Sequence, residues 1–231
     1  MNGTLYEFPK QAAFGRVLPK TKVFAFGKVT RRLRDLFAAE VERIVWQFKL
    51  APETVNLPAG TGVNEIQVFG LELKAGIHEP NEDLLRCIDN AIAFPIFFEV
   101  TAATPTTTRI KVVTAFKRPS EADSSKWVVG DYFSTDWLPA NTARSPLPVA
   151  LNLESLYEQM LRSMMPITPR PGESLQSLAE RHQLIAVKQR ELAKLDQRLK
   201  REKQFNRRVD INAQLREVTA QVDALMDGRT L

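Results

Sequence analysis

The chain has 231 residues, of which 44% are hydrophobic, enough to bury one substantial core and still carry an extension. Its single cysteine, Cys87, excludes an internal disulfide framework and a cysteine-rich zinc site, and two histidines, His78 and His182, leave little for a histidine-based one. The formal net charge of +5 is unevenly distributed: residues 1–34 hold eight Lys or Arg against one acid, whereas residues 35–170 hold twelve against seventeen acids.

Basic ends on an acidic body suit docking on nucleic acid or on an acidic partner, although basic ends that bind nothing are about as common. No apolar run approaches the roughly 20 residues needed to span a bilayer, and the N-terminal stretch lacks the apolar core of a signal peptide. We therefore expect a soluble, unprocessed, cytoplasmic protein.

Residues 1–27 mix scattered aromatics with prolines and glycines, which predicts an irregular basic arm with a short strand at KVFAF, residues 22–26. From Thr30 to Phe48 apolar residues recur at helical spacing, so the pattern predicts one helix with Thr30 as its N-cap and Pro52 as its stop. The arginines of this helix lie on its other face, which is either solvated or in contact with phosphates; they are Arg31, Arg32, Arg34 and Arg43.

The stretch NEIQVFGLELK, residues 64–74, reads as a strand whose alternation changes parity in the middle. A β-bulge near Phe69 and Gly70 would restore a single buried face, because a one-residue slip otherwise moves every later side chain to the other side of the sheet. The polar residues would then share the opposite face; they are Glu65, Gln67, Glu72 and Lys74.

A helix is predicted at residues 82–92, followed by strands at 95–102, 109–117 and 126–134. The first two strands flank a helix, as a parallel crossover requires, and the later ones are joined by loops short enough for antiparallel pairing. Together with an apolar-faced helix at 154–165, these elements predict an α+β (or α/β) domain over residues 28–165, with flanking helices on a mixed sheet of about four to five strands.

PITPRPG, residues 166–172, is a proline-rich linker, and the segment 173–227 after it contains neither Gly nor Pro. Leucine-type residues recur every seven positions up to Leu199, and a second apolar series begins at Ile211, out of phase with the first. This pattern predicts a helical arm that is either a coiled coil with an adjusted phase or, as we favour, a two-helix hairpin.

A basic cluster occupies the phase break, where Phe205 is expected to pack and hold the arm tip; its cations are Lys200, Arg201, Lys203, Arg207 and Arg208. One interpretation is a solvated helix surface. The other is a basic tip that contacts the DNA backbone or an acidic partner, since phosphate neutralisation needs clustered Lys and Arg more than any fixed spacing.

Chemical motifs are sparse. Glu72 and Lys74 have the spacing used by metal-dependent nucleases, in which an acid helps to bind Mg²⁺ and a lysine stabilises charge at the scissile phosphate. Such a site needs a further acid, for which Glu65 and the more distant Glu99 are the candidates. No GxxxxGK phosphate loop or glycine-rich dinucleotide fingerprint is present, so we expect no cofactor, and Mg²⁺ only if the nuclease alternative holds.

Four segments carry a family resemblance: WQFKLAPETVNLP, EIQVFGLELK, AFKRPSEADSSKWVVGDYF and LKREKQFNRRVDINAQL. With them the chain resembles, over nearly its whole length, the bacterial domain-of-unknown-function family numbered 4391. The resemblance implies a gene beside site-specific DNA methyltransferases and helicases in restriction-like phage-defence loci, and hence an accessory subunit. It supplies no catalytic residues.

The leading hypothesis is therefore a non-enzymatic adaptor, whose body docks a helicase or DNA methyltransferase and whose arm bridges to DNA or to a second subunit. The first alternative is a metal-dependent nuclease that uses Glu65, Glu72 and Lys74. The second is a protein whose arm makes a homodimer and binds no nucleic acid.

Overall fold

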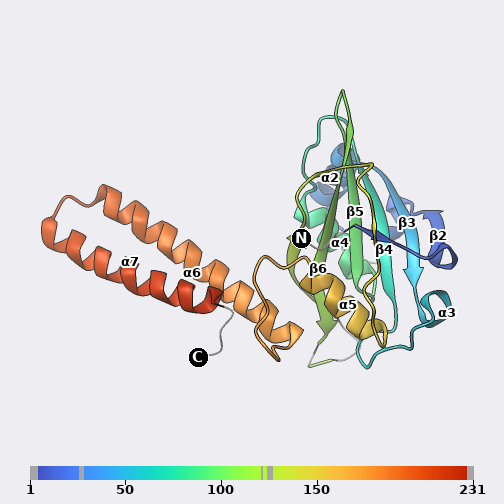
Figure 1. The fold of residues 1–231 in the computed structure, drawn as a ribbon. Helices are drawn as coiled ribbons and strands as arrows, with labels where there is room; N and C mark the ends of the chain where they lie inside the picture. Colours follow the sequence, from blue (N-terminus) through green and yellow to red (C-terminus); the bar gives the residue numbers. More distant parts are fainter. Residues whose placement is uncertain (1–4, 26–28, 121, 124–126, 228–231) are drawn as a thin grey trace. The chain divides into compact units, whose positions relative to one another are not determined.

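The computed structural model of the protein describes residues 5–25, 29–120, 122–123 and 127–227. The chain divides into two compact units, Met1–Met164 and Met165–Leu231. The first holds a mixed sheet with helices, and the second holds two long helices (Figure 1). Within the described residues, no helix is both long and apolar enough to cross a membrane.

The first unit is built on a sheet that, in the described part of the chain, has seven strands. The order of neighbouring strands is β2 (Ala13–Val17), β3 (Val41–Leu50), β4 (Ile66–Leu73), β5 (Ile96–Ala103), β6 (Thr108–Pro119) and β7 (Trp127–Ser134). The short strand β8 (Leu138–Pro139) pairs with Arg109 and Ile110 at the start of β6. The mixed α+β architecture is confirmed, but the prediction of about four to five strands was too small.

The connections follow the predicted scheme. Helix α4 (Glu82–Ala91) links β4 to β5, and these two strands pair in parallel. Short connections join β5 to β6 and β6 to β7, and both pairs are antiparallel. The parallel pair thus results from a helical crossover, since only a connection of that length returns the chain to the same end of the sheet.

The predicted helix that starts after Thr30 is wrong in its second half. Helix α2 (Arg31–Glu40) begins as expected, with the Thr30 hydroxyl accepting a hydrogen bond from the Leu33 N–H at 3.3 Å. At Val41 the chain becomes strand β3, which pairs with both β2 and β4. The β-branched and aromatic residues of VERIVWQF favour a strand, and apolar spacing alone does not separate the two structures over so short a stretch.

The N-terminal segment is not an irregular arm. After β1 (Tyr6–Glu7) and a 3₁₀ turn at Lys10–Ala12, β2 forms one edge of the sheet. Residues predicted as a strand at KVFAF fall largely in helix α1 (Lys20–Ala25), and the rest of that segment lies outside the described residues. Val23 of α1 is only 2% exposed, so tertiary packing, rather than local sequence, orders this segment.

The parity change in β4 has a different cause from the one predicted. β4 pairs with β5 without interruption, and the irregularity near this point lies on β3, where the register shifts between Trp46 and Phe48. Both faces of β4 are buried, so apolar residues are required at both parities. Gln67 and Glu72 consequently lie on opposite faces of the sheet instead of sharing one.

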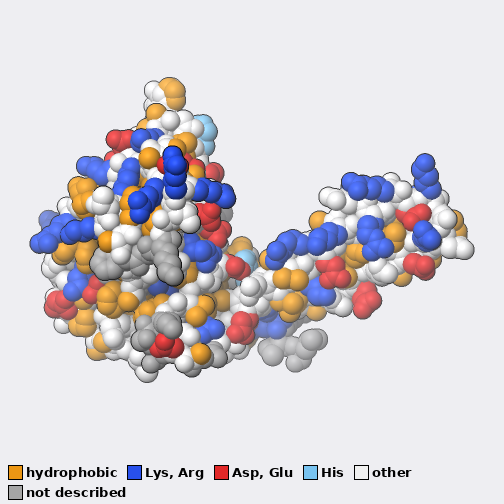
Figure 2. All heavy atoms as spheres, turned by 180° about the vertical axis from the view of Figure 1, so that it is seen from behind, with side chains coloured by type: hydrophobic (Ala, Val, Ile, Leu, Met, Phe, Trp, Pro, Cys, Tyr) orange, Lys and Arg blue, Asp and Glu red, His pale blue; other side chains and the backbone are white. Residues whose placement is uncertain are grey.

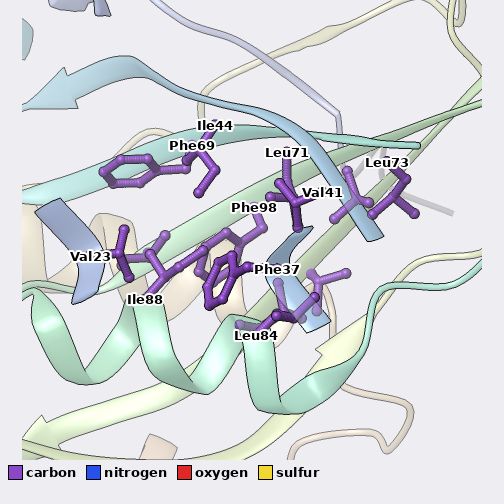
Figure 3. Close-up of a cluster of buried hydrophobic side chains, with 14 of the residues drawn as sticks. Val23, Phe37, Val41, Ile44, Phe69, Leu71, Leu73, Leu84, Ile88 and Phe98 are labelled. Carbon is purple, nitrogen blue, oxygen red and sulfur yellow. The ribbon is translucent and has the colours of Figure 1, made fainter. Parts of the chain in front are cut away.

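One face of the sheet is covered by α1, α2 and α4, and the main core lies between these layers (Figure 3). Phe37 from α2, Leu84 and Ile88 from α4, and Phe69 and Phe98 from the sheet are each at most 1% exposed. These side chains point toward one another in the close-up, which makes the helix layer and the sheet a single packed body.

The opposite face carries α5 (Leu153–Arg162) and the N-terminal ribbon of β1 with β9 (Ser145–Pro146) (Figure 1). Asn152 caps α5 by accepting a hydrogen bond from the Ser155 N–H at 2.8 Å. The ring of Tyr157 on α5 packs edge-on against the ring of Phe97 on β5, with ring centroids 6.2 Å apart. The sheet therefore has a helix on each face.

A buried lysine connects the layers of this unit. Lys117 of β6 is 2% exposed, and its ammonium donates to the backbone carbonyls of Asp89 (2.6 Å) and Ile92 at the end of α4. The carboxylate of Asp89, 1% exposed, lies 3.5 Å from the same ammonium and accepts a hydrogen bond from Tyr132 at 2.5 Å. On the other face, the backbone N–H of Lys117 donates to the Tyr157 hydroxyl at 2.9 Å.

The second unit contains α6 (Leu175–Arg201) and α7 (Phe205–Met226), which run antiparallel as a hairpin (Figure 1). Leu195 of α6 packs with Ile211 and Val218 of α7, each of them 5–6% exposed. The two apolar series predicted from the sequence are thus the facing stripes of two helices. Their phase differs because the chain leaves the helix at residues 202–204.

Arg181 closes the open end of the hairpin. Its guanidinium donates to both carboxylate oxygens of Glu173 (2.7 and 2.8 Å), to the Thr168 carbonyl (2.8 Å) and to the Leu225 carbonyl at the end of α7 (2.7 Å). Arg181 is 6% exposed. This bidentate pair joins the segment before α6 to the last turn of α7, and it lowers the pKa of Glu173 to about 2.

We predict that Lys117→Met strongly destabilises the first unit. The change leaves the Asp89 carboxylate buried without its cation and removes the ammonium donor from the Asp89 and Ile92 carbonyls, a loss typically of about 3–5 kcal/mol in the free energy of unfolding. Urea unfolding followed by tryptophan fluorescence measures it. Arg43→Met is the matched control, because its ion pair with Glu72 is 53% and 40% exposed, and its effect should be far smaller. Equal losses would show that the burial of Lys117 is not what matters.

The Glu173 pKa predicts an acid-sensitive hairpin. Because the folded pKa lies below the ordinary value of 4.5, the pair contributes its full stability above pH 4.5 and loses it as the pH falls toward 2. Helical circular dichroism during urea unfolding should show this loss in the wild type. Glu173→Gln should be less stable at neutral pH and should lose less between pH 4.5 and 2, whereas the exposed Glu180→Gln should match the wild type.

Candidate functional site

The turn between α6 and α7 presents the basic cluster predicted from the sequence. α6 ends at Arg201, residues 202–204 form the turn, and α7 begins at Phe205. The Glu202 carboxylate accepts hydrogen bonds from the backbone N–H groups of Gln204 and Lys203, both at 2.9 Å, and these bonds lower its pKa. The acid within the turn is therefore already used to hold its backbone.

The cations around this turn all reach solvent. Exposed side chains are found at Lys200, Arg201, Lys203, Arg207 and Arg208. Lys200 pairs with Asp196 at 2.6 Å in an exposed contact, which is weak in water. Figure 2 shows Lys and Arg side chains along the hairpin up to its loop end. The structure thus groups the predicted cations on one exposed surface, which we call the hairpin tip.

The helix dipoles act differently on the two sides of the tip. Lys200 and Arg201 lie in the last turn of α6, where the negative end of the helix dipole favours cations. Arg207 and Arg208 lie in the first turn of α7, whose positive end favours anions, and this turn contains no acid. Gln204, the N-cap of α7, provides no side-chain hydrogen bond. The first turn of α7 therefore has no acid of its own to balance Arg207 and Arg208.

Phe205 does not pack as expected. It begins α7 at the predicted break, but its side chain is 78% exposed. The hairpin is held instead by residues further along, because Leu199 and Leu215 pack with Ile211 and the aromatic ring lies outside this cluster. The expectation that Phe205 packs at the phase break and anchors the tip is therefore wrong.

The arginines of α2 are also exposed. Arg31, Arg32 and Arg34 lie near the start of the helix, and the Arg34 guanidinium lies 5.7 Å from the centre of the Phe24 ring. Arg32 lines a cavity of about 380 Å³ between α2 and α4, together with Asp83 and Arg86. These residues form a second basic surface, on the first unit.

The nuclease candidates do not converge. Seven residues at about 3.3 Å each place Glu65 and Glu72 roughly 23 Å apart along the strand, on opposite faces. Glu72 forms an exposed ion pair with Arg43 of the neighbouring strand at 2.5 Å, and Glu65 pairs with Lys49 at 3.3 Å. Lys74 follows the end of β4, where its backbone N–H donates to the Glu40 carbonyl at 2.8 Å.

Glu99, the more distant acid candidate, has a structural partner. Its carboxylate accepts hydrogen bonds from both terminal nitrogens of Arg144, at 2.5 and 2.8 Å, and Arg144 also donates to the Tyr6 carbonyl. This contact fastens the N-terminal ribbon to the sheet. Over the described residues, no group of three or more His, Cys, Asp or Glu side chains is arranged to hold a metal ion.

Sequence reasoning missed the cluster of Lys117, Asp89 and Tyr132. Burial raises the pKa of Asp89 and lowers the pKa of Lys117, and burial together with the adjacent Asp89 raises the pKa of Tyr132. The sequence contained a signal, since Lys117 falls on the same strand parity as the buried Val113 and Ala115. Because its donors and acceptors are satisfied within the core, we assign this cluster to stability.

The model of the family described as "Domain of unknown function (DUF4391)" matches residues 7–222. The chain belongs to the DUF4391 family. The match spans both units, so the sheet domain and the helical hairpin are parts of one DUF4391 protein. No curated protein and no solved structure matches the chain. The resemblance seen in the sequence is thus confirmed at the level of the family.

The exposure of Phe205 generates a prediction about the hairpin. Phe205→Ala should change the free energy of unfolding by no more than about 0.5 kcal/mol, as expected for an exposed side chain. Ile211→Ala, which empties a buried site 5% exposed, should cost about 2–5 kcal/mol. Thermal unfolding followed by circular dichroism compares the two variants. A large loss for Phe205→Ala would show that the ring packs on the hairpin after all.

Proposed function

We propose that this DUF4391 protein is a non-enzymatic accessory subunit of a restriction-like or phage-defence complex, in which the sheet domain docks a helicase or DNA methyltransferase and the hairpin tip contacts DNA. The observation that carries the proposal is the hairpin tip itself. Five exposed cations flank a turn whose one acid is engaged by backbone N–H groups.

Electrostatics favours a polyanion at this surface. Arg207 and Arg208 lie at the positive end of a helix that has no acid in its first turn, so an anion placed there gains from the side chains and from the dipole together. Nucleic-acid phosphates provide such charge repeatedly, and Phe205 adds an exposed ring suited to stacking on an unpaired base.

A loop of the sheet domain supports docking to a protein. Val149 and Leu151 are 95% and 87% exposed, although the backbone around them is fixed. The Gln159 side chain donates to the Val149 carbonyl at 2.9 Å, and the Leu151 N–H donates to the Ser155 hydroxyl at 3.2 Å. Two apolar side chains held outward in this way suit insertion into an apolar cleft of a partner.

The geometry gives the nuclease alternative less support, because the carboxylates it requires lie on opposite faces of the sheet. Self-association through the hairpin remains the competing use of the second unit. Co-purification of the full chain with its neighbouring helicase and methyltransferase distinguishes the hypotheses. Elution with either enzyme at physiological salt supports the adaptor, and elution of a dimer of this chain alone contradicts it.

We predict that Arg207→Glu with Arg208→Glu weakens binding to duplex DNA of any sequence, because phosphate contacts carry no base information. The affinity of the wild type should fall with salt with a log–log slope of about 0.9 per phosphate contacted, and the variant should have a shallower slope. Fluorescence anisotropy with one labelled duplex at several salt concentrations measures both.

The matched control is Arg190→Glu with Lys194→Glu. These residues are also exposed and lie on α6, before its last turn, so the change in net charge is identical while the hairpin tip is preserved. The control should keep a higher affinity and a steeper slope than the tip variant. Identical curves for the two variants would mean that only net charge, and not the hairpin tip, governs binding.

A further inference from the structure

A cavity of about 300 Å³ opens in the first unit beside the starts of β4 and β5. Its lining is mainly apolar and comes from α1, from the end of α4 and from the sheet; Lys22, Trp46, Gln67, Phe69, Ile92 and Ala93 contribute to it. This volume lies at the lower end of the range of small-molecule sites, about 300–1,000 Å³, and suits one ring system rather than a large cofactor.

Two aromatic rings form a fixed wall of the cavity. Trp46 and Phe69 stack with centroids 5.8 Å apart and planes 20° from parallel. The Trp46 indole N–H donates to the Phe48 carbonyl at 3.1 Å. The Phe14 ring packs against the indole, with the two ring centroids 4.2 Å apart. The indole is therefore held in place without a ligand and gives the cavity an ordered aromatic wall.

Gln67 brings one oriented polar atom to this apolar wall. It is 4% exposed, and its amide nitrogen donates to the Glu65 carboxylate at 2.6 Å. Because an ionised carboxylate only accepts hydrogen bonds, this contact fixes which end of the amide is the oxygen. Within the part of the chain that the structure describes, that oxygen accepts no hydrogen bond. A ligand with an N–H donor would satisfy it.

Lys22 supplies a cation on the same cavity. It is exposed, and among the described residues its ammonium has no ion-pair partner. The lining thus combines an aromatic wall, one oriented acceptor and one exposed cation. An anionic substituent on a flat ligand could reach the ammonium while the ring occupies the apolar part.

We propose that this cavity binds a single nucleotide, with the base packed against the aromatic wall of Trp46 and Phe69, an N–H of the base donating to the Gln67 amide oxygen, and a phosphate near Lys22. Every common base carries such an N–H on its edge, so the site selects for a nucleotide without selecting strongly among bases. The nucleotide is either free or an unpaired residue of a nucleic-acid strand. The site belongs to the first unit and does not rest on the function of the hairpin tip.

Isothermal titration calorimetry with the full chain tests the proposal. The probes are the common 5′-mononucleotides, the matching nucleosides, a single-stranded oligonucleotide and the corresponding duplex. Arg207→Glu with Arg208→Glu serves as the background for the strands, so that the hairpin tip does not dominate. Saturable binding of mononucleotides identifies a free nucleotide as the ligand. Binding of the single strand alone, weaker for the duplex, identifies an unpaired residue.

Variants connect the binding to the cavity. Lys22→Ala should lower mononucleotide affinity by about tenfold and leave nucleoside affinity unchanged, because it removes a charged contact to the phosphate. Ala93→Phe, at an exposed position on the cavity, should block binding of all ligands in a folded protein. Lys10→Ala is the control for loss of an exposed lysine away from the lining, and should bind as the wild type does.

Two results would overturn the proposal. One is the absence of saturable binding for every mononucleotide and for the single strand. The other is binding that Lys22→Ala and Ala93→Phe leave unchanged, since the ligand would then occupy some other surface. Because Ala93 is exposed, a loss caused by misfolding is recognised by comparing the circular dichroism of that variant with the wild type.

Discussion

The buried ammonium of Lys117 is the contact on which the layered order of the first unit depends. Its charge lies in the core, where it closes the end of α4 through backbone carbonyls and faces the Asp89 carboxylate. The backbone of the same residue donates to Tyr157 of α5 on the opposite face. A charge removed from water is tolerated only when its partners are fixed, so this one residue sets the position of α4 against the sheet and ties in α5.

Fixing the end of α4 also shapes the surfaces nearby. The Ile92 carbonyl accepts a hydrogen bond from Lys117, and Ile92 lines the same cavity as Trp46 and Gln67. The cavity exists because α4 must end there to begin the parallel strand β5, which leaves space between the last turn of the helix and the rings on the sheet. A cavity at this place follows from the crossover, since the helix cannot cover the sheet beyond its own end.

In the hairpin, the residues that stabilise the two helices are different from those exposed at the tip. Arg181 and the apolar stripes hold the open end and the length of the two helices, whereas the tip keeps its cations and Phe205 in solvent. Because the residues that stabilise the hairpin are not those that it exposes, the tip can change its charge without unfolding the helices.

The sequence by itself determined the family, the mixed α+β class, the parallel crossover and the basic cluster at residues 200–208, because local spacing and charge carry these features. It did not determine that VERIVWQF is a strand, because apolar spacing fits either structure and pairing with β2 and β4 decided it. Nor did it determine that Glu65 and Glu72 lie on opposite faces, that Lys117 contacts Asp89, or that Trp46 and Gln67 line one cavity. Such contacts join residues distant in sequence, and only the packing of the whole sheet brings them together.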